Sequence, residues 1–100
     1  MAASRKAKPK KQLAKSARRV DFMLDSPEAN KVMLAGDFND WNYENAPLKK
    51  VSDNTWKRTM NLKPGRYEYK FVVDGNWTVD PKNDNRAWNA LGVENSVIEI

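Results

Sequence analysis

Three of the four tryptophans stand among polar residues, where a large ring has no obvious core to enter. They are Trp41, Trp77 and Trp88, and their neighbours are mainly Asn, Asp and Thr. Exposed aromatic rings on a soluble protein often mark a binding surface. Rings that are accompanied by amide and hydroxyl groups suit a ligand with flat C–H faces and many hydroxyls, such as a sugar. A nucleic-acid base would stack on the same rings.

The polar groups near these rings favour a neutral ligand. They supply both donors and acceptors without much charge, and they are Asn39, Asn42, Lys70, Asn76, Thr78, Asn89 and Asn95. The whole chain carries a formal charge of +5, but residues 20–100 contain ten Lys and Arg against 13 Asp and Glu. Because phosphate groups bind best to a basic surface, this mildly acidic body favours a neutral glycan over a nucleic acid.

The residue types that are missing exclude several kinds of chemistry. The chain has no Cys and no His, so it cannot form disulfides, thiolate metal sites or a Ser-His or Cys-His catalytic pair. Its 100 residues allow one small domain, which is too short for the ~250-residue barrel that hosts glycoside hydrolysis. A glycosidase also needs two carboxylates across a cleft. We therefore expect no catalytic residue, no metal ligand, no cofactor and no enzyme activity.

The basic charge is concentrated at the N-terminus. Residues 1–19 contain eight Lys and Arg and no acid, so we expect residues 1–18 to form a flexible basic tail. The tail lacks the apolar core of a secretory signal, and its Lys-rich composition with Lys8-Pro9 is untypical of a transit peptide. No apolar run is long enough to span a membrane. These features predict a cytoplasmic protein with no membrane contact, whose tail either is solvated or binds an anionic surface.

The rest of the chain, residues 19–100, shows the two-residue period of β-strands. Alternation predicts strands at 20–25, 55–62 and 67–73, and residues 31–36 are predicted to form a strand that is apolar on both faces. Further strands are expected at 76–79 and 96–100, with an irregular stretch at 80–95 that includes Trp88. Residues 63–66 read as a tight turn, and Asp74-Gly75 matches a type I′ hairpin turn. Short connections predict antiparallel pairing, and short strands at this spacing indicate a β-sandwich or a small barrel.

Strand parity separates the aromatic residues that should form the core from those that should face solvent. The predicted core aromatics are Phe22, Trp56, Tyr67, Tyr69 and Phe71. In the polar segment 37–42, Phe38 is the better candidate for an anchor on the core, which leaves Trp41 as the exposed ring.

A long set of ordered motifs carries a family resemblance. The motifs are residues 32–41 (VMLAGDFNDW), Pro47-Leu48, Trp56, residues 62–77 (LKPGRYEYKFVVDGNW), Asp80-Pro81 and residues 89–97 (NALGVENSV). Over about residues 19–100 the chain resembles carbohydrate-binding module family 48. That family includes the glycogen-binding domain of the AMP-activated protein kinase β-subunit and the early-set domains of isoamylases and glycogen branching enzymes. The resemblance implies an all-β fold, an immunoglobulin-like (early-set) antiparallel β-sandwich, that binds α-1,4-glucans such as glycogen or starch-like oligosaccharides.

The resemblance also implies roles for particular side chains. Trp41 and Trp77 match two tryptophans that stack on glucose rings, and Lys70 matches a lysine that donates to sugar hydroxyls. Leu91 matches a leucine that presses against the glucan, and Asn95 matches an asparagine before the last strand. Val93 stands where the kinase module has a threonine, so one polar contact differs. Trp88 either enlarges the sugar platform or covers the edge of the core.

Two other functions are compatible with the same residues. The sandwich could serve as the scaffold of a regulatory or protein-interaction subunit of a glucan-metabolising enzyme or kinase, with the basic tail docking an acidic partner. Nucleic acid could bind through the tail only. The salt dependence of binding distinguishes these functions, because the affinity of a charge-driven contact falls steeply with salt, whereas that of sugar stacking barely changes.

Overall fold

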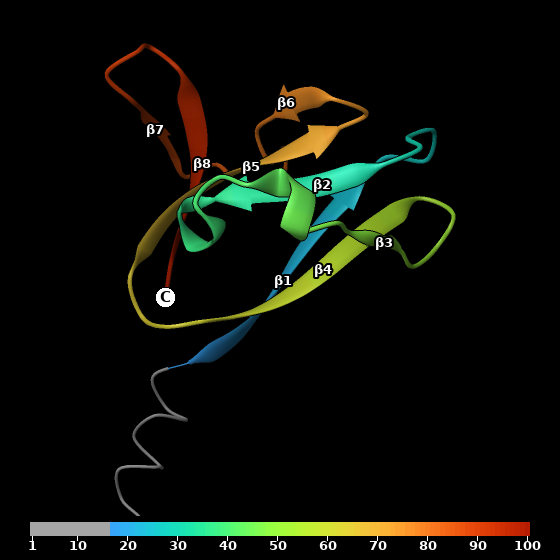
Figure 1. Cartoon of the computed structure of the whole chain (residues 1–100), viewed down its shortest axis with the longest axis horizontal. Coiled ribbons are helices and arrows are strands. Elements are labelled where there is room, and N and C mark those ends of the chain that lie inside the picture. Colours follow the sequence, from blue (N-terminus) through green and yellow to red (C-terminus); the bar gives the residue numbers. More distant parts are fainter. Residues whose placement is uncertain (1–16) are drawn as a thin grey trace, which may run out of the picture.

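The computed structural model describes residues 17–100 (Figure 1), so residues 1–16 of the predicted tail lie outside the described part. Two antiparallel sheets form a sandwich. The smaller sheet has the order β1-β4-β3, with β1 Arg18–Asp25, β4 Thr55–Leu62 and β3 Lys49–Lys50. The larger sheet has the order β2-β5-β8-β7, and β6 pairs in addition with the C-terminal end of β5. Its strands are β2 Val32–Gly36, β5 Arg66–Val73, β6 Asn76–Thr78, β7 Arg86–Trp88 and β8 Glu94–Glu99.

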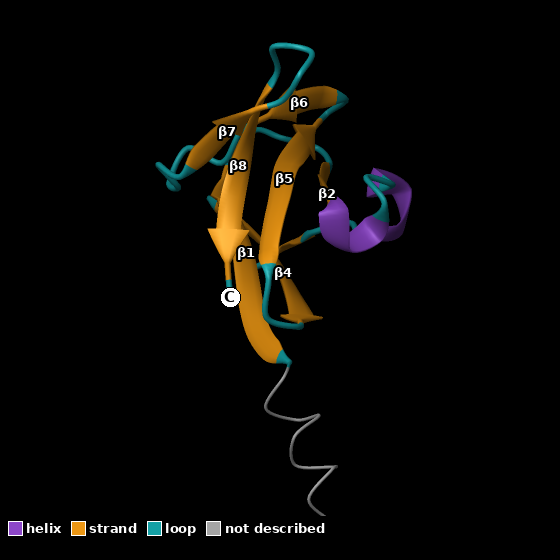
Figure 2. Ribbon diagram, turned by 90° about the vertical axis from the view of Figure 1, so that its left-hand side faces the viewer, coloured by secondary structure: helices purple, strands orange, loops and turns teal. Residues whose placement is uncertain are grey.

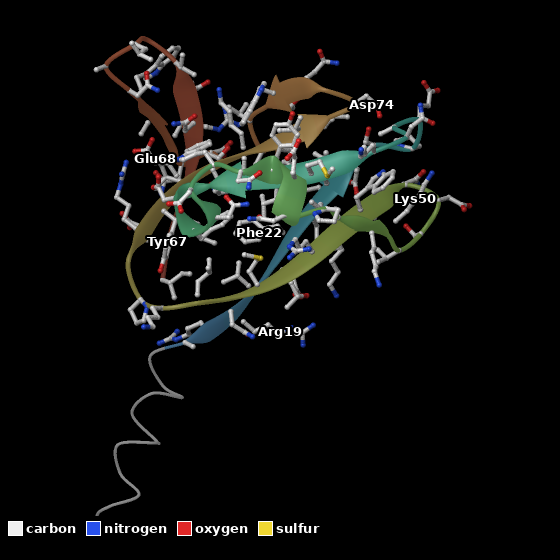
Figure 3. The ribbon with its side chains drawn as sticks, in the orientation of Figure 1. Arg19, Phe22, Lys50, Tyr67, Glu68 and Asp74 are labelled. Carbon is white, nitrogen blue, oxygen red and sulfur yellow. The ribbon has the colours of Figure 1, made fainter. Side chains whose placement is uncertain are left out.

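The core lies between the two sheets and follows the two-residue period of the sequence. Phe22 and Leu24 of β1 are buried while Met23 between them is exposed, because successive side chains of a strand point to opposite faces. Figure 3 shows Phe22 between the sheets, and its ring packs edge-on against Tyr69 with centroids 5.0 Å apart. The predicted core aromatics Phe22, Trp56, Tyr69 and Phe71 are buried, and Tyr67 is partly buried against them.

Two polar groups of the core rings find hydrogen-bond partners, as burial requires. The indole Nε1 of Trp56 donates to the carbonyl of Ser26 over 2.9 Å. The hydroxyl of Tyr69 donates to Oδ2 of the buried Asp80 over 2.7 Å. The first bond ties β4 to the loop after β1, and the second ties β5 to the loop between β6 and β7.

The tight turns occur where the sequence predicts them. Asp74 and Gly75 both have positive φ, 49° and 88°, as a type I′ turn requires, and β6 follows at once. Between β2 and β3 the chain forms two short 3₁₀ turns, η1 Asp37–Asn39 and η2 Tyr43–Asn45, which appear as the purple segments in Figure 2. The sequence predicts only a polar loop there.

The prediction of an irregular stretch at 80–95 is wrong at its end. Residues 86–88 form β7, which pairs with β8, and β8 begins at Glu94, two residues earlier than predicted. Trp88 therefore ends a strand and does not lie in a loop. Strands of two or three residues, such as β3 and β7, are too short to show a period, and only pairing with a neighbour defines them. Within residues 17–100 no helix has the length and apolar character needed to cross a bilayer.

Candidate functional site

A shallow groove with a volume of about 600 Å³ lies on the outer face of the larger sheet. Three parts of the fold form it: the loop that begins with η1, the strands β5 and β6, and the hairpin of β7 and β8. The residues that line it are Asp37, Trp41, Glu68, Lys70, Trp77, Asn89, Val93 and Asn95. Four of the six residues that the sequence predicts for a sugar site, Trp41, Lys70, Trp77 and Asn95, therefore meet in one groove.

The backbone at Trp41 is held in an unusual conformation. Asp40 and Trp41 have φ values of 54° and 59°, in the left-handed region that bulky residues avoid. The amide of Trp41 donates to the carbonyl of Gly36 over 2.9 Å and closes the loop. Such strain costs about 1–3 kcal/mol and persists only where the surroundings over-determine it, most often at functional sites.

Asn39 supplies much of that constraint. Its Oδ1 accepts the amide of Gly36 over 2.9 Å, and its Nδ2 donates to the carbonyls of Leu34 and Asn42, both over 3.1 Å. Asn42 in turn caps η2, because its Oδ1 accepts the amide of Glu44. The side chains of Asn39 and Asn42 thus stabilise the Trp41 loop through hydrogen bonds to its own backbone.

Asp37 connects the loop to both the ring and the sheet. Its Oδ1 accepts a hydrogen bond of 3.0 Å from the indole Nε1 of Trp41, and its Oδ2 accepts the backbone amide of Glu68 over 2.8 Å. One carboxylate therefore fixes the rotation of the Trp41 ring relative to β5. Trp41 is half-buried rather than fully exposed, because this bond and the neighbouring Trp77 cover part of the ring.

Trp77 reaches the groove through the hairpin turn at residues 74–75. It pairs with Val72 in the β5–β6 ladder and is 49% exposed. Its ring centroid lies 6.4 Å from that of Trp41, and the two ring planes are tilted by 37°. Tyr43 of η2 packs edge-on against the Trp77 ring, with centroids 5.8 Å apart and an interplanar angle of 84°. The two tryptophans thus form a tilted, supported platform.

Glu68 and Lys70 of β5 form the floor of the groove. Both point to the outer face, since they alternate with the inward residues Tyr69 and Phe71. In Figure 3, Glu68 lies on β5 close to the β7–β8 hairpin. Its Oε1 accepts Nδ2 of Asn95 over 2.9 Å, and its Oε2 accepts Nη1 of Arg66 over 2.8 Å.

These contacts determine the state of the Glu68 carboxylate. The hydrogen bond from Asn95 and then that from Arg66 lower the pKa of Glu68 below its ordinary value. The groove consequently holds two carboxylates, Asp37 and Glu68, and one ammonium group, that of Lys70. This near balance of charge suits a neutral polyhydroxylated ligand better than a polyanion.

The other two predicted site residues lie on the β7–β8 hairpin but do not line the groove. Leu91 is 86% exposed at the tip of the hairpin. Trp88 is 68% exposed and pairs with Glu94, whereas Asn95, which lines the groove, pairs with Ala87. Because adjacent strand positions point to opposite faces, Trp88 lies on the face of the hairpin away from the groove.

Sequence reasoning missed Asp37, Glu68 and Tyr43 as residues of the site. Asp37 and Glu68 are 31 positions apart in the chain, and their contact depends on the pairing of β2 with β5. Tyr43 lies in a turn that has no recognisable sequence pattern. Among residues 17–100 no cluster of three or more His, Cys, Asp or Glu side chains is arranged to hold a metal ion.

Fold and groove together define a small β-sandwich binding module with an aromatic surface. Residues 12–100 match the family model for the glycogen recognition site of AMP-activated protein kinase. The chain belongs to this glycogen-recognition family of non-catalytic carbohydrate-binding modules. The match covers the whole of the groove and both sheets.

Individual proteins agree with the family match. The 5′-AMP-activated protein kinase subunit beta-1 of Sus scrofa is 37% identical over 70 residues, covering 70% of this chain and 54% of that protein. Protein PTST homolog 2, chloroplastic, of Arabidopsis thaliana is 42% identical over 53 residues, which are 53% of this chain and 10% of that protein. Protein FLOURY ENDOSPERM 6, chloroplastic, of Oryza sativa subsp. japonica is 33% identical over 87 residues, which are 87% of this chain and 16% of that protein. The chain thus spans about half of the first of these relatives and a small part of the other two.

A solved structure supports the fold independently. Maltogenic amylase from S. marinus contains a region that superposes with a TM-score of 0.70 at 23% identity, covering 82% of this chain and 13% of that one. At this identity the likeness concerns the fold alone. It agrees with the early-set β-sandwich that the family resemblance implies, and it decides between the sandwich and the small barrel that the strand pattern left open.

Proposed function

We propose that the groove binds α-1,4-glucan chains, with Trp41 and Trp77 as the stacking platform. The observation that carries the proposal is the tilt of 37° between the two rings, whose centroids are 6.4 Å apart. A curved glucan chain presents successive glucose faces at an angle, whereas a flat β-glucan does not. The family to which the chain belongs supports the choice of glycogen or a related polymer.

The other predicted residues take supporting roles in this proposal. Lys70 on the groove floor donates to sugar hydroxyls, and Asn95 contacts the ligand while its Nδ2 is bound to Glu68. Leu91, exposed at the hairpin tip, presses against the chain where it leaves the groove. Val93 lines the groove and adds an apolar contact in place of a hydroxyl.

The affinity for a short oligosaccharide should be modest. Each ring contributes about 1–2 kcal/mol by stacking, and each hydrogen bond adds about 1 kcal/mol. Association itself costs several kcal/mol, so Kd should fall between about 10 μM and about 1 mM. A polymer that offers many equivalent chains binds more tightly through avidity.

A fluorescence titration tests the site. Maltoheptaose is added to the wild type, to Trp41→Ala and to Trp77→Ala, with Met23→Ala on β1 of the smaller sheet as the control. The proposal expects saturable binding by the wild type and the control, and at least tenfold weaker binding by both tryptophan variants. Cellohexaose should not bind at the same concentrations. Wild-type protein with an intact β-sheet spectrum that fails to bind maltoheptaose at millimolar concentration would refute it.

We also propose that the module has no hydrolytic activity of its own. The two carboxylates of the groove are engaged in binding other parts of the protein: Asp37 accepts two hydrogen bonds and Glu68 accepts two more. A general acid must carry a proton at working pH, and the lowered pKa of Glu68 keeps it ionised. Prolonged incubation with maltoheptaose should release no reducing sugar.

A partner protein is a second proposal, and a second cavity favours it. This cavity has a volume of about 440 Å³ on the smaller sheet, and its lining combines the cations Lys49, Lys57 and Arg58 with apolar Val51. Such a surface suits an acidic segment of a glucan-metabolising enzyme or kinase. Lys49→Glu combined with Lys57→Glu should abolish that association and leave maltoheptaose binding unchanged.

We propose the cytoplasm as the location of the protein. Two plant relatives are chloroplastic proteins by name, so an organelle is the alternative location. A fluorescent fusion of the whole chain, imaged in its native cell, distinguishes the cytoplasm from an organelle.

A further inference from the structure

Exposed apolar side chains concentrate on one short segment of the molecule. Among residues 17–100 six large hydrophobic residues are exposed, and three of them fall between residues 88 and 93. They are Trp88, Leu91 and Val93, with exposed fractions of 68%, 86% and 40%. Single exposed hydrophobic residues are common, but such a concentration on one hairpin marks a contact surface.

The tip of this hairpin is internally braced. The amide of Asn89 donates to the carbonyl of Val93 over 2.9 Å, and the amide of Gly92 donates to the carbonyl of Asn89 over 3.0 Å. The Oδ1 of Asn89 also accepts the amides of Leu91 and Val93, over 2.9 and 3.0 Å. The exposed side chains are therefore carried on a fixed backbone, which lowers the entropy cost of binding.

The hairpin has two faces, and only one of them belongs to the groove. Asn95 and Val93 line the groove, while Trp88 and its cross-strand partner Glu94 occupy the alternate positions. Figures 1 and 2 show the hairpin of β7 and β8 extending beyond the rest of the sandwich, so the face that bears Trp88 is open to solvent. The exposed fraction of Trp88 agrees with this placement.

Polar groups of fixed position border the Trp88 ring. Glu94 lies opposite it in the ladder, and its Oε1 is 3.6 Å from Nη1 of Arg86, two residues before Trp88 on the same strand face. Arg86 is itself held by donating to the carbonyls of Asn83 and Asp80, both over 2.8 Å. An aromatic face beside a paired carboxylate and guanidinium offers stacking, acceptors and donors at no net charge.

We infer that Trp88 and Glu94 form a second α-glucan contact surface, separate from the groove, so that one module holds two glucan chains. The inference rests on the proposed function, because it assumes that the groove binds the first chain. A sugar fits the surface for the same reasons as in the groove: a ring for its C–H face and neutral polar groups for its hydroxyls. A branched polymer supplies neighbouring chains at high local concentration, which suits two weak sites on one hairpin.

Indole resonances report the two sites separately. In a ¹⁵N-labelled protein the four Trp Nε1–H signals are followed as maltoheptaose is added to the wild type, Trp41→Ala and Trp88→Ala. The Trp88 signal should shift in the wild type and still shift in Trp41→Ala, with a midpoint of its own. The Trp41 and Trp77 signals should shift in Trp88→Ala as they do in the wild type. A Trp88 signal that stays still at saturating sugar overturns the inference.

A polymer assay tests the bivalent contact. Wild-type protein should bridge glycogen particles and raise light scattering, whereas Trp88→Ala should bind glycogen about three- to tenfold more weakly without bridging them. Met23→Ala, which removes an exposed apolar side chain from β1 of the smaller sheet, should behave as the wild type does. Sedimentation of the protein without glucan must show the same monomer for both, because a dimer formed through Trp88 would also bridge particles and would overturn the inference.

The two proposals fail in different ways. If the wild type does not bind maltoheptaose at all, the proposed function fails and the second surface with it. If the wild type binds in the groove but Trp88→Ala bridges glycogen equally well, the groove stands and the second surface is refuted. A folded Trp88→Ala protein is expected, since the side chain is mainly exposed.

Discussion

The indole Nε1 of Trp41 donates to Oδ1 of Asp37 over 3.0 Å, and this bond sets the angle of one ring of the groove platform. The other oxygen of the same carboxylate is bound to the backbone of β5 through the amide of Glu68. The orientation of the Trp41 ring is therefore fixed relative to β5 of the larger sheet, and not only relative to its own loop. A ring fixed before binding loses less entropy when the ligand arrives.

Removing this carboxylate should weaken glucan binding although Asp37 does not stack on the sugar. Asp37→Ala frees the Trp41 indole and leaves the amide of Glu68 without its acceptor, so maltoheptaose affinity should fall by about 1 kcal/mol, or roughly fivefold. Asp37→Asn keeps one acceptor oxygen, so its affinity for maltoheptaose should lie between that of Asp37→Ala and that of the wild type. Titration by tryptophan fluorescence measures both, with Asp53→Ala in an exposed loop as the control. Equal affinity for wild type and Asp37→Ala would remove Asp37 from the site.

Replacing Lys70 separates hydrogen bonding from charge. Lys70→Met keeps the methylene stem on the groove floor and removes the donors, so the affinity for maltoheptaose should fall by about 1 kcal/mol. Because the ligand is neutral, added salt should change neither protein's affinity. Lys63→Met, in the turn before β5, is the matched control. Wild-type affinity that drops steeply with salt would instead point to an anionic ligand.

Acid should destabilise the module in part through Glu68. Hydrogen bonds from Asn95 and Arg66 lower its pKa from the ordinary value of 4.5 in the folded protein. A depressed folded pKa contributes stability that is present above the unfolded value and is lost as pH falls through the folded one. The difference in Tm between wild type and Glu68→Gln should therefore be full near about pH 6 and shrink below about pH 4.5.

Thermal unfolding followed by circular dichroism across this range measures the effect. Glu28→Gln, which changes an exposed carboxylate in the turn after β1, serves as the reference. A difference between wild type and Glu68→Gln that stays constant down to low pH would contradict the assignment of the ion pair and the Asn95 bond to Glu68.

A side chain at Gly36 should destabilise the fold because β5 and the Phe38 ring lie against this position. A Cβ at this position would be 2.7 Å from the carbonyl oxygen of Glu68, 2.7 Å from Cζ of Phe38 and 2.8 Å from Cβ of Tyr69. Gly36→Ala should cost about 1–3 kcal/mol in the free energy of unfolding and should also weaken maltoheptaose binding, since η1 must move from β5. Denaturant titration measures the first and fluorescence the second. A variant with wild-type stability would show that the contact at Gly36 is looser than the structure has it.

Local patterns in the amino-acid sequence are sufficient to predict the core strands and the class of ligand. Alternation at residues 20–25, 55–62 and 67–73 is enough to fix which side chains enter the core, because one face of each strand packs against the other sheet. The Asp74-Gly75 turn follows from local backbone preference alone. Tryptophans surrounded by amides indicate a sugar before any fold is known, because stacking and hydrogen bonding depend on side-chain type.

Which of those residues share a surface depends on how distant strands pair. Asp37 meets Glu68 across 31 positions of sequence because β2 pairs with β5, and no local pattern records that pairing. No local pattern assigns Trp88 and Asn95 to different faces, yet the β7–β8 register places them on opposite faces of one hairpin. A shift of one residue in that register would exchange the two faces, because strand side chains alternate with a period of two. Pairing between distant strands thus gathers some of the sugar-compatible residues into the groove. The same pairing places Trp88 on the opposite face of the β7–β8 hairpin.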